Sequence, residues 1–187
     1  DYLKYDNCNA FHVPGGTVDG KTVRYPTMSK ALKKTGRNIF YAMCNWGFED
    51  TWLWASPIAN SWRTTTDLFN GWDQVIRVLD LQVNITSFGG PGGWNDMDML
   101  QVGNGGLNFE EAKSQFSLWA ALKSPLIIGC DLNTVAKDQL QIMMETDIIA
   151  INQDRLGAPA RRAVAFRDGQ RDHDVWTVAV ENGNVAV

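Results

Sequence analysis

The sequence predicts an α/β fold in which a parallel β-sheet with covering helices precedes the start of an antiparallel β-domain. Two patterns lead to this prediction. Up to about residue 157, short apolar runs alternate with segments whose apolar residues recur at helical spacing, which is typical of βα units. Beyond Gly157, residues 163–167 and 175–181 alternate apolar and polar side chains, and Asn182-Gly183 is a hairpin turn sequence. We therefore expect two domains, residues 1–157 and 158–187.

Each predicted strand is a short apolar run. Tyr2–Tyr5 alternates apolar and polar side chains, whereas Asn38–Cys44 is almost entirely apolar, which is typical of a strand buried on both faces. The remaining runs are shorter or less regular, and they predict strands at residues 58–63, 93–99 and 125–130.

The segments between the strands predict the helices. Gly36 closes the first helix, and Asn108 with Glu111 resembles a capping pair that opens the third. A Gly-rich loop is expected over residues 7–19. The expected helices cover residues 26–34, 67–81, a segment from Asn108 past Trp119, and 133–145.

Five βα units are fewer than the eight of a closed (β/α)8 barrel. The chain lacks an initiating methionine, and Asp1 opens directly into a strand pattern. We therefore expect the sequence to begin inside a larger protein, whose preceding part would supply the other three units. An open doubly wound sheet is the competing arrangement, but no GxGxxG motif follows the first strand.

The composition is that of a globular protein. Of the 187 residues, 44% are hydrophobic and 20% are charged, which allows a sizeable core and argues against disorder. The net charge of −4, with no basic stripe, argues against nucleic acid or an anionic membrane as a partner. No apolar run approaches the roughly 20 residues that span a bilayer.

Three cysteines, Cys8, Cys44 and Cys130, lie far apart without a CxxC pair, and the chain has only two histidines. A structural zinc site is therefore not expected, and no other metal is implied. The odd count fits one cysteine bonded to a partner outside this sequence, and three reduced thiols fit it equally well. Asn84-Ile85-Thr86 is an N-glycosylation sequon, which favours Asn84 as a glycan acceptor on a secretory route.

Polar residues follow the predicted strands where each strand ends. In barrel enzymes the catalytic groups lie at these carboxyl ends and in the βα loops. One polar strand end is ordinary solvation, but several in succession, with charged groups beside Trp and Met, indicate a pocket. The groups concerned are Lys4 and Asp6, Cys44-Asn45-Trp46, Trp62-Arg63 with Asp67, residues 94–99, and Asp131, the last without an assigned role.

Two carboxylates from different strands, together with aromatic walls, are what a glycosidase needs. Apolar faces of sugar rings stack on Trp, and sugar hydroxyls bind Lys, Arg and Asp side chains. In a retaining enzyme one carboxylate attacks the anomeric carbon and the other protonates the leaving oxygen, the two lying ~5–5.5 Å apart. Phosphate chemistry would need a Gly-rich cradle or a metal, and the sequence shows neither.

Four stretches occur in a fixed order: DYLKYDNC, CNWG, NSWRTTTD and GGPGGWNDMDMLQVGNGGL. They resemble the motifs of glycoside hydrolase family 27, the α-galactosidases and α-N-acetylgalactosaminidases. The resemblance runs from Asp1 to about Gly157, and the later residues fit the start of the family's C-terminal antiparallel β-sandwich. It implies that the sequence holds strands four to eight of a (β/α)8 TIM barrel and lacks the first three.

The resemblance also implies a role for each matching residue. Asp6 matches the nucleophile, and Asp67 matches the general acid/base. Lys4 matches a lysine that binds sugar hydroxyls and faces the nucleophile, and it is expected to keep Asp6 ionised. A general acid must hold its proton, so we expect Asp67 just before the first helical turn, where the helix dipole is weak.

The remaining matches concern substrate binding and the loops around the pocket. Cys8 matches a cysteine that pairs with one upstream of this sequence. Asp96 is interpreted as a structural residue that orients its loop. The expected substrate-binding residues are Arg63 and Asp98 for hydroxyls, Met99 lining the pocket, and Cys44 and Trp46 beside the 2-hydroxyl.

Several of these residues have a purely structural alternative. Lys4 and Asp6 share one side of a strand and could form only a buried ion pair. Asp67 could cap its helix, as Asp often does. Cys44 could be a small core residue, and Trp46 could serve packing alone.

These observations predict an α-galactosidase, a retaining exo-glycosidase that releases terminal α-linked galactose from oligosaccharides or glycoconjugates without a cofactor. An α-N-acetylgalactosaminidase and a β-L-arabinopyranosidase are the alternatives within the family. Trp46 and Phe48 make their loop bulky, which favours galactose over its N-acetylated counterpart. A non-catalytic carbohydrate-binding barrel is an alternative of another class, against which both carboxylates and Arg63 argue. The expected location is extracellular, or a lysosome- or vacuole-like compartment; no oligomeric state is predicted.

Overall fold

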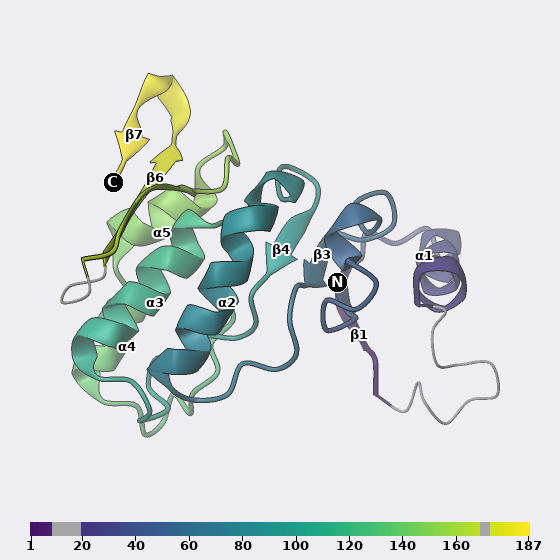
Figure 1. Cartoon of the computed structure of the whole chain (residues 1–187). Helices are drawn as coiled ribbons and strands as arrows, with labels where there is room; N and C mark the ends of the chain where they lie inside the picture. Colours follow the sequence, from purple (N-terminus) through teal and green to yellow (C-terminus); the bar gives the residue numbers. More distant parts are fainter. Residues whose placement is uncertain (9–19, 169–172) are drawn as a thin grey trace.

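The computed structural model describes residues 1–8, 20–168 and 173–187 (Figure 1). Most of the expected Gly-rich loop over residues 7–19 lies outside these ranges. In the described part, a parallel sheet with helices occupies most of the chain, and a small antiparallel sheet follows it.

The parallel sheet has the strand order β1-β2-β3-β4, which is also the order along the chain. Its strands are β1 (Tyr2–Asp6), β2 (Phe40–Cys44), β3 (Ser61–Arg63) and β4 (Trp94–Asp96). The register pairs Asp6 with Cys44 and Arg63 with Asp96. The last residues of all four strands therefore lie along one edge of the sheet, as the predicted βα arrangement requires.

The expected fifth strand at residues 125–130 is not formed as a strand. Leu100 and Ile128 make a single parallel bridge, and the Leu100 N–H donates to the Ile127 carbonyl at 2.9 Å. Pro125 has no N–H to give to a ladder, and its carbonyl accepts from Ile127 within the same segment. This segment therefore runs beside the chain after β4 without extending the ladder.

The helices follow the prediction with shifted boundaries. The third opens with the expected capping box, in which the Asn108 side chain accepts from the Glu111 N–H and Glu111 accepts from the Asn108 N–H. Of the expected helix over 133–145, only Lys137–Met143 is helical, after a turn, and a further helix that was not expected follows at Thr146–Gln153. The bounds are α1 (Tyr25–Lys34), α2 (Trp72–Ile85), α3 (Phe109–Ala121), α4 (Lys137–Met143) and α5 (Thr146–Gln153).

Two apolar clusters hold the parallel sheet and its helices together. The smaller one packs α1 under β2 and β3 through Tyr25, Tyr41 and Trp62. The larger one joins α2, α3 and α4 through residues such as Val78, Trp119 and Ile142. In Figure 1, α1 lies at the β1 end of the parallel sheet, and α2, α3 and α4 lie beyond β4 at the other end.

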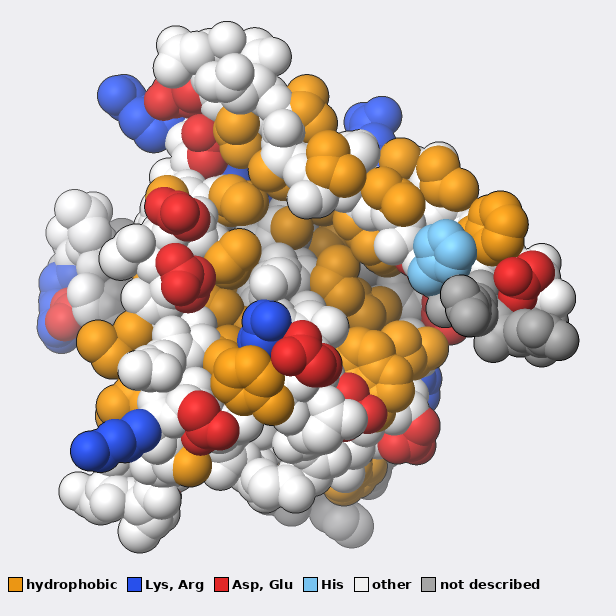
Figure 2. Space-filling view, turned by 90° about the vertical axis from the view of Figure 1, so that its left-hand side faces the viewer, with side chains coloured by type: hydrophobic (Ala, Val, Ile, Leu, Met, Phe, Trp, Pro, Cys, Tyr) orange, Lys and Arg blue, Asp and Glu red, His pale blue; other side chains and the backbone are white. Residues whose placement is uncertain are grey.

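The antiparallel sheet contains β5 (Arg161–Phe166), β6 (His173–Ala179) and β7 (Val185–Ala186), with the expected turn at residues 181–183. Its Val178 is buried in the larger cluster, and Arg162 lies 3.5 Å from Asp80 of α2. The sheet thus packs directly on the helices. Between them runs a groove of about 930 Å³, on the face where Figure 2 shows a hollow lined by apolar side chains.

No helix within the described ranges is long and apolar enough to cross a membrane.

Candidate active site

The expected catalytic and binding residues gather at one edge of the parallel sheet. Asp6, Cys44, Arg63 and Asp96 are the last residues of β1, β2, β3 and β4. Asp67 and Asp98 follow in the loops after β3 and β4. Parallel strands put these ends side by side, so residues far apart in the sequence form one site.

Asp6 lies among several hydrogen-bond donors. Its Oδ1 accepts from the N–H of Asn7 at 2.7 Å, and from the N–H and the Sγ of Cys8 at 3.2 and 3.3 Å. Lys4 Nζ lies 4.0 Å from Oδ2. Lys4 and Asp6 therefore share one side of β1, as the two-residue repeat of a strand predicts.

The environment lowers the pKa of Asp6. Partial burial raises it, but this effect is outweighed by hydrogen bonds from the Cys44 and Cys8 side chains and the Asn7 N–H, and then by the charge of Lys4. The carboxylate is thus kept ionised mainly by hydrogen bonds, with a smaller contribution from Lys4 than the sequence suggested. More than a third of the Lys4 and Asp6 side chains is exposed, so the pair is not a buried ion pair.

Cys44 connects Asp6 to Arg63. It is fully buried, and its sulfur accepts from Arg63 Nη1 at 3.7 Å. Burial raises the pKa of the Cys44 thiol to about 12, so near neutral pH the thiol keeps the proton that it donates to Asp6. Cys44 is therefore a core residue that also contacts the site, and its buried sulfur offers no surface to a ligand.

Arg63 is the centre of the charge network. Its side chain is almost completely buried, and Nη2 lies 2.8 Å from Asp98 Oδ2 and 3.4 Å from Asp67 Oδ1. A charge so deeply buried requires such partners, because desolvating it alone would be very unfavourable. Its contacts are those of a residue that positions the two carboxylates.

Asp67 lies in the loop between β3 and α2, with 65% of its side chain exposed. The helix begins at Trp72, with Gly71 at the N-cap and no side chain capping it. The predicted helix start at residue 67 is therefore wrong, and Asp67 does not cap α2. Its position before the helix agrees with the one expected of a general acid. The carboxylates of Asp6 and Asp67 both contribute to raising the pKa of Cys8, behind the hydrogen bond from Cys8 to Asp6, so both carboxylates act on the same exposed thiol.

Asp98 adopts a left-handed backbone conformation, with φ of 82°. Its Oδ2 accepts from the Leu68 N–H at 2.8 Å in addition to its contact with Arg63. Its Oδ1 accepts from the N–H of Met99, whose side chain is partly exposed. The carboxylate thus ties the loop after β4 to the loop that carries Asp67.

Asp96 is buried behind Asp98, and its Oδ1 accepts from the Asp98 N–H at 2.8 Å. Burial raises the pKa of Asp96, and the charge of Arg63 opposes this effect. The position agrees with a residue that orients its loop.

Trp46 lies in a strained loop after β2. Trp46, Glu49 and Asp50 all have positive φ, and Trp46 packs edge to face on Phe48 at 6.0 Å between ring centroids. Gly47 lies so close to the Thr64 carbonyl that a Cβ there would come within 2.1 Å of its oxygen. The bulky aromatic pair is therefore held against the loop that follows β3. The half-buried Trp46 is compatible with both packing and sugar contact.

Asn84 and Asp131 lie apart from this network, whereas Cys8 and Cys44 belong to it. Cys8, Cys44 and Cys130 are all free in this structure. Asn84 is exposed in the last turn of α2. Asp131 holds a local turn by accepting from the N–H and the side chain of Asn133, both at 2.9 Å.

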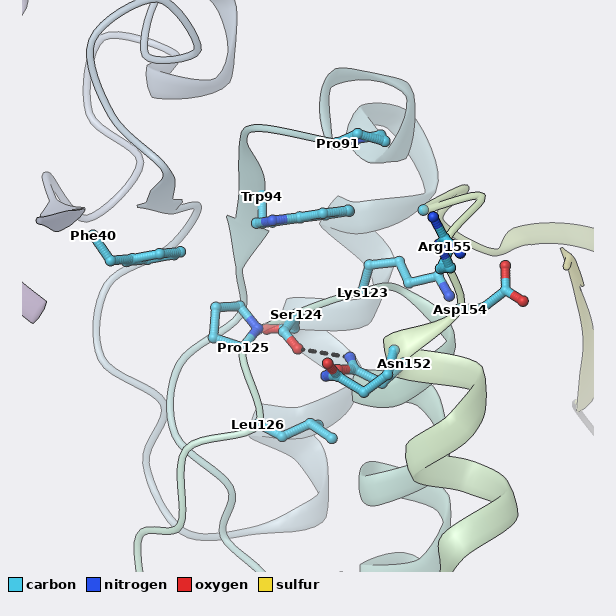
Figure 3. Close-up of a pocket in the computed structure, with 12 residues that line it drawn as sticks. Phe40, Pro91, Trp94, Lys123, Ser124, Pro125, Leu126, Asn152, Asp154 and Arg155 are labelled. Atoms are coloured by element: carbon cyan, nitrogen blue, oxygen red, sulfur yellow. Dashed lines mark hydrogen bonds between the residues drawn. The ribbon is translucent and has the colours of Figure 1, made fainter. Parts of the chain in front are cut away.

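A second hollow lies at the opposite ends of the strands. This cavity of about 380 Å³ is lined by Phe40 and Trp94, the first residues of β2 and β4, and by Lys123 and Arg155. Figure 3 shows Asn152 donating to the Ser124 carbonyl, at 3.1 Å, on one wall of it. None of the predicted site residues lines this cavity.

Sequence reasoning missed the residues that hold the site loops from behind. Trp119 donates its indole N–H to the Asp98 carbonyl at 2.8 Å, and Gln101 Nε2 donates to the Leu68 carbonyl at 3.0 Å. Helical spacing indicated that Trp119 faces the core, but no local pattern shows which carbonyl its indole reaches. Within the described residues, no cluster of His, Cys, Asp or Glu could hold a metal ion.

Comparison with known proteins places the chain in a family. The family model described as alpha galactosidase A matches residues 1–154. Alpha-galactosidase 3 of Arabidopsis thaliana is 44% identical over 188 residues, which covers 100% of this chain and 41% of the plant protein.

Solved structures agree. Alpha-galactosidase I from Mortierella vinacea has a TM-score of 0.87 at 36% identity, over 97% of this chain and 50% of that one. Alpha-galactosidase from Saccharomyces cerevisiae, solved with raffinose, has a TM-score of 0.84 at 36% identity, over 98% of this chain and 46% of that one. The chain thus spans half or less of the length of these relatives, and its two sheets are consistent with part of a barrel and a following β-sheet. The chain belongs to the alpha galactosidase A family, glycoside hydrolase family 27.

Proposed function

We propose that this protein is an α-galactosidase that hydrolyses terminal α-galactosyl residues with retention of configuration. The observation that carries the proposal is an ionised carboxylate, Asp6, at the end of β1, with a second carboxylate, Asp67, on the loop of a nearby strand. The curated relatives that share this sequence are alpha-galactosidases, which supports the same activity here.

The reaction would proceed by two displacements. Asp6 attacks the anomeric carbon, and the electron pair of the glycosidic bond leaves with the aglycone oxygen, which takes a proton from Asp67. The ionised Asp67 then removes a proton from water, whose oxygen attacks the same carbon and releases Asp6. The second step regenerates both carboxyl groups in their starting states, so no cofactor is consumed.

The remaining residues divide into two groups. Lys4, Met99 and Trp46 have exposed or half-buried side chains at the strand ends, and these, together with the largely buried Asp98 carboxylate, are the proposed contacts of the sugar. Cys44 and Arg63 have almost no accessible surface, so we assign them the task of holding Asp6, Asp67 and Asp98 in place.

The loop after β2 supports galactose as the preferred sugar. Trp46 and Phe48 pack against each other there and fill space that a bulky 2-acetamido group would need. Equal rates on aryl α-galactoside and aryl α-N-acetylgalactosaminide would contradict this assignment. Parallel assays with the aryl β-L-arabinopyranoside test the other member of the family.

The proposed nucleophile is tested by Asp6→Asn in the full-length protein. We expect the wild type to release nitrophenol from nitrophenyl α-galactoside, and the variant to lose at least about a thousandfold in kcat, because an amide cannot form the galactosyl ester. Asp131→Asn is the matched control, since the Asp131 carboxylate accepts from the N–H and the side chain of Asn133 in a local turn. Near-wild-type turnover by Asp6→Asn would remove the nucleophile assignment.

We further propose that the four strands and the segment at Ile128 correspond to strands four to eight of a barrel, and that residues 158–187 begin the next domain. Cys8 is proposed to pair with a cysteine outside this sequence, which mass mapping of disulfide-linked peptides would detect. We propose that the protein enters the secretory route and carries a glycan on the exposed Asn84. A mass loss on enzymatic deglycosylation that is absent in Asn84→Gln tests this assignment.

A further inference from the structure

Both backbone polar groups of Asp98 are bound by buried side chains. Its N–H donates to Asp96 Oδ1, and its carbonyl accepts from Trp119 Nε1, each at 2.8 Å. The two partners come from different elements, the end of β4 and the last turn of α3. A non-glycine residue at φ of 82° is unfavourable without such restraints.

The Asp98 side chain contacts the loop that carries Asp67, so the restrained backbone of Asp98 also limits where that loop can lie. Its Oδ2 contacts the Leu68 N–H and Arg63 Nη2, both at 2.8 Å, and Arg63 Nη2 lies 3.4 Å from Asp67 Oδ1. Leu68 follows Asp67 directly and is buried in the core. The position of the Asp67 carboxyl group therefore depends on where the Asp98 carboxylate is held.

We propose that Asp96 and Trp119 are positioning residues that fix the Asp98 turn and thereby aim Asp67 at the leaving oxygen. This inference rests on the proposed function. Both side chains are buried, so neither contacts a substrate directly. Their effect is carried by Asp98, Arg63 and the Leu68 N–H.

A shift of about 1 Å in a catalytic group can reduce the rate on the order of a hundredfold. If Asp67 is misplaced, the loss depends on how much the leaving group needs its proton. Methanol is a poor leaving group and needs the proton, whereas dinitrophenolate leaves without it. A defect in Asp67 therefore lowers kcat/KM more for methyl α-galactoside than for 2,4-dinitrophenyl α-galactoside. A defect in galactose binding, or in the amount of folded protein, lowers both equally.

The experiment measures kcat/KM for these two substrates in the full-length protein. Trp119→Phe removes the indole N–H and keeps most of the ring. We expect it to lower kcat/KM at least about tenfold more for the methyl galactoside than for the dinitrophenyl galactoside. Asp96→Ala should show the same selective loss, and Asp96→Asn a smaller one, because its amide oxygen still accepts the Asp98 N–H. Asp67→Ala gives the full selective loss for reference.

Trp62→Phe is the matched control. Trp62 is as completely buried as Trp119, and its indole N–H donates over the same 2.8 Å, but to the Asn95 side chain. We expect Trp62→Phe to change kcat/KM for both substrates by the same factor.

The outcomes separate the two proposals. An inactive, folded wild type, or an Asp67→Ala variant without a selective loss, overturns the proposed function. Suppose that Asp67→Ala shows the selective loss, but Trp119→Phe and the Asp96 variants lower kcat/KM equally for both substrates, or do not lower it. The positioning role is then overturned and the proposed function stands. The experiment still tests the positioning role if Asp96→Ala fails to fold, because Trp119→Phe and Asp96→Asn are milder changes.

Discussion

Cys44 places a neutral thiol between a buried guanidinium and the carboxylate of Asp6. The thiol donates to Asp6 and is the foremost of the contacts that lower the pKa of that carboxyl group. Lys4, which the sequence suggested for this task, contributes less. In the proposed reaction the attacking form of Asp6 is the ionised one, so a lowered pKa extends the proposed activity to lower pH.

This arrangement predicts a change in the pH profile of Cys44→Ala. Without the S–H donor the pKa of Asp6 rises, so a higher pH is needed to ionise it. The acidic limb of kcat/KM against pH should therefore move to higher pH, with a smaller movement in Cys44→Ser, whose hydroxyl still donates. Cys130→Ala removes a thiol outside the network and should leave the limb in place. If the acidic limb of Cys44→Ala lies at the same pH as in the wild type, or at lower pH, the thiol does not hold Asp6 ionised.

At the residue scale, the sequence was most informative where the relevant geometry is local. Lys4 and Asp6 fall on one side of β1 because side chains alternate along a strand. The contacts of Asp6 with Cys44, and of Asp98 with Trp119, join separate elements through particular atoms. Neither composition nor spacing encodes such contacts, so they required the folded structure.

Among the elements, the loop between β2 and β3 is closely confined at Gly47. Gly47 has φ of 78°, and a Cβ on it would come within 2.1 Å of the Thr64 carbonyl oxygen and 2.7 Å of its carbon. These are backbone atoms, next to Arg63, and they cannot turn aside as a flexible side chain would. The close approach of the two loops therefore requires glycine.

Gly47→Ala is accordingly expected to weaken both the fold and the site. Gly36→Ala is the matched control, because Gly36 has φ of 70° but no atom lies within 4 Å of the place that an alanine methyl group would occupy. Left-handed alanine alone costs roughly 1–2 kcal/mol, and overpacking adds about 1–3 kcal/mol. Denaturant unfolding should show the larger loss of stability for Gly47→Ala, with reduced kcat/KM in that variant only. Equal losses in both variants would mean that the loop moves away freely.

The element boundaries show where sequence patterns were insufficient. Helical spacing begins near Leu68, yet α2 begins at Trp72. The intervening loop is held instead by Asp98 and Gln101, which bind the N–H and the carbonyl of Leu68. Tertiary hydrogen bonds thus override a local helical pattern. The capping box at Asn108, which needs only residues three apart, was predicted correctly.

Over the whole molecule, the antiparallel sheet and the helices share one hydrophobic core. Val178 of β6 is 3% exposed and lies in the cluster that also contains Val78 of α2 and Trp119 of α3. Trp176 packs against the same cluster from its edge. The hairpin turn and strand alternation predicted the sheet itself. They did not reveal that its apolar face closes the core of the preceding helices, because alternation says which face is apolar and not what covers it.

A shared core predicts that a change in the antiparallel sheet destabilises the part that carries the candidate active site. Val178→Ala removes two buried methyl groups, which should lower the free energy of unfolding by about 2 kcal/mol. Val185→Ala, on β7 where the side chain is 60% exposed, makes the same chemical change and should stay within about 0.5 kcal/mol of the wild type. Denaturant titrations of the full-length protein, followed by tryptophan fluorescence and by residual galactosidase activity, measure both. Because α3 carries Trp119, whose indole holds the Asp98 turn, loss of the sheet contact should bring the activity midpoint down together with the fluorescence midpoint. If Val178→Ala lowers the fluorescence midpoint and leaves the activity midpoint unchanged, the sheet unfolds on its own and the single core is disproved.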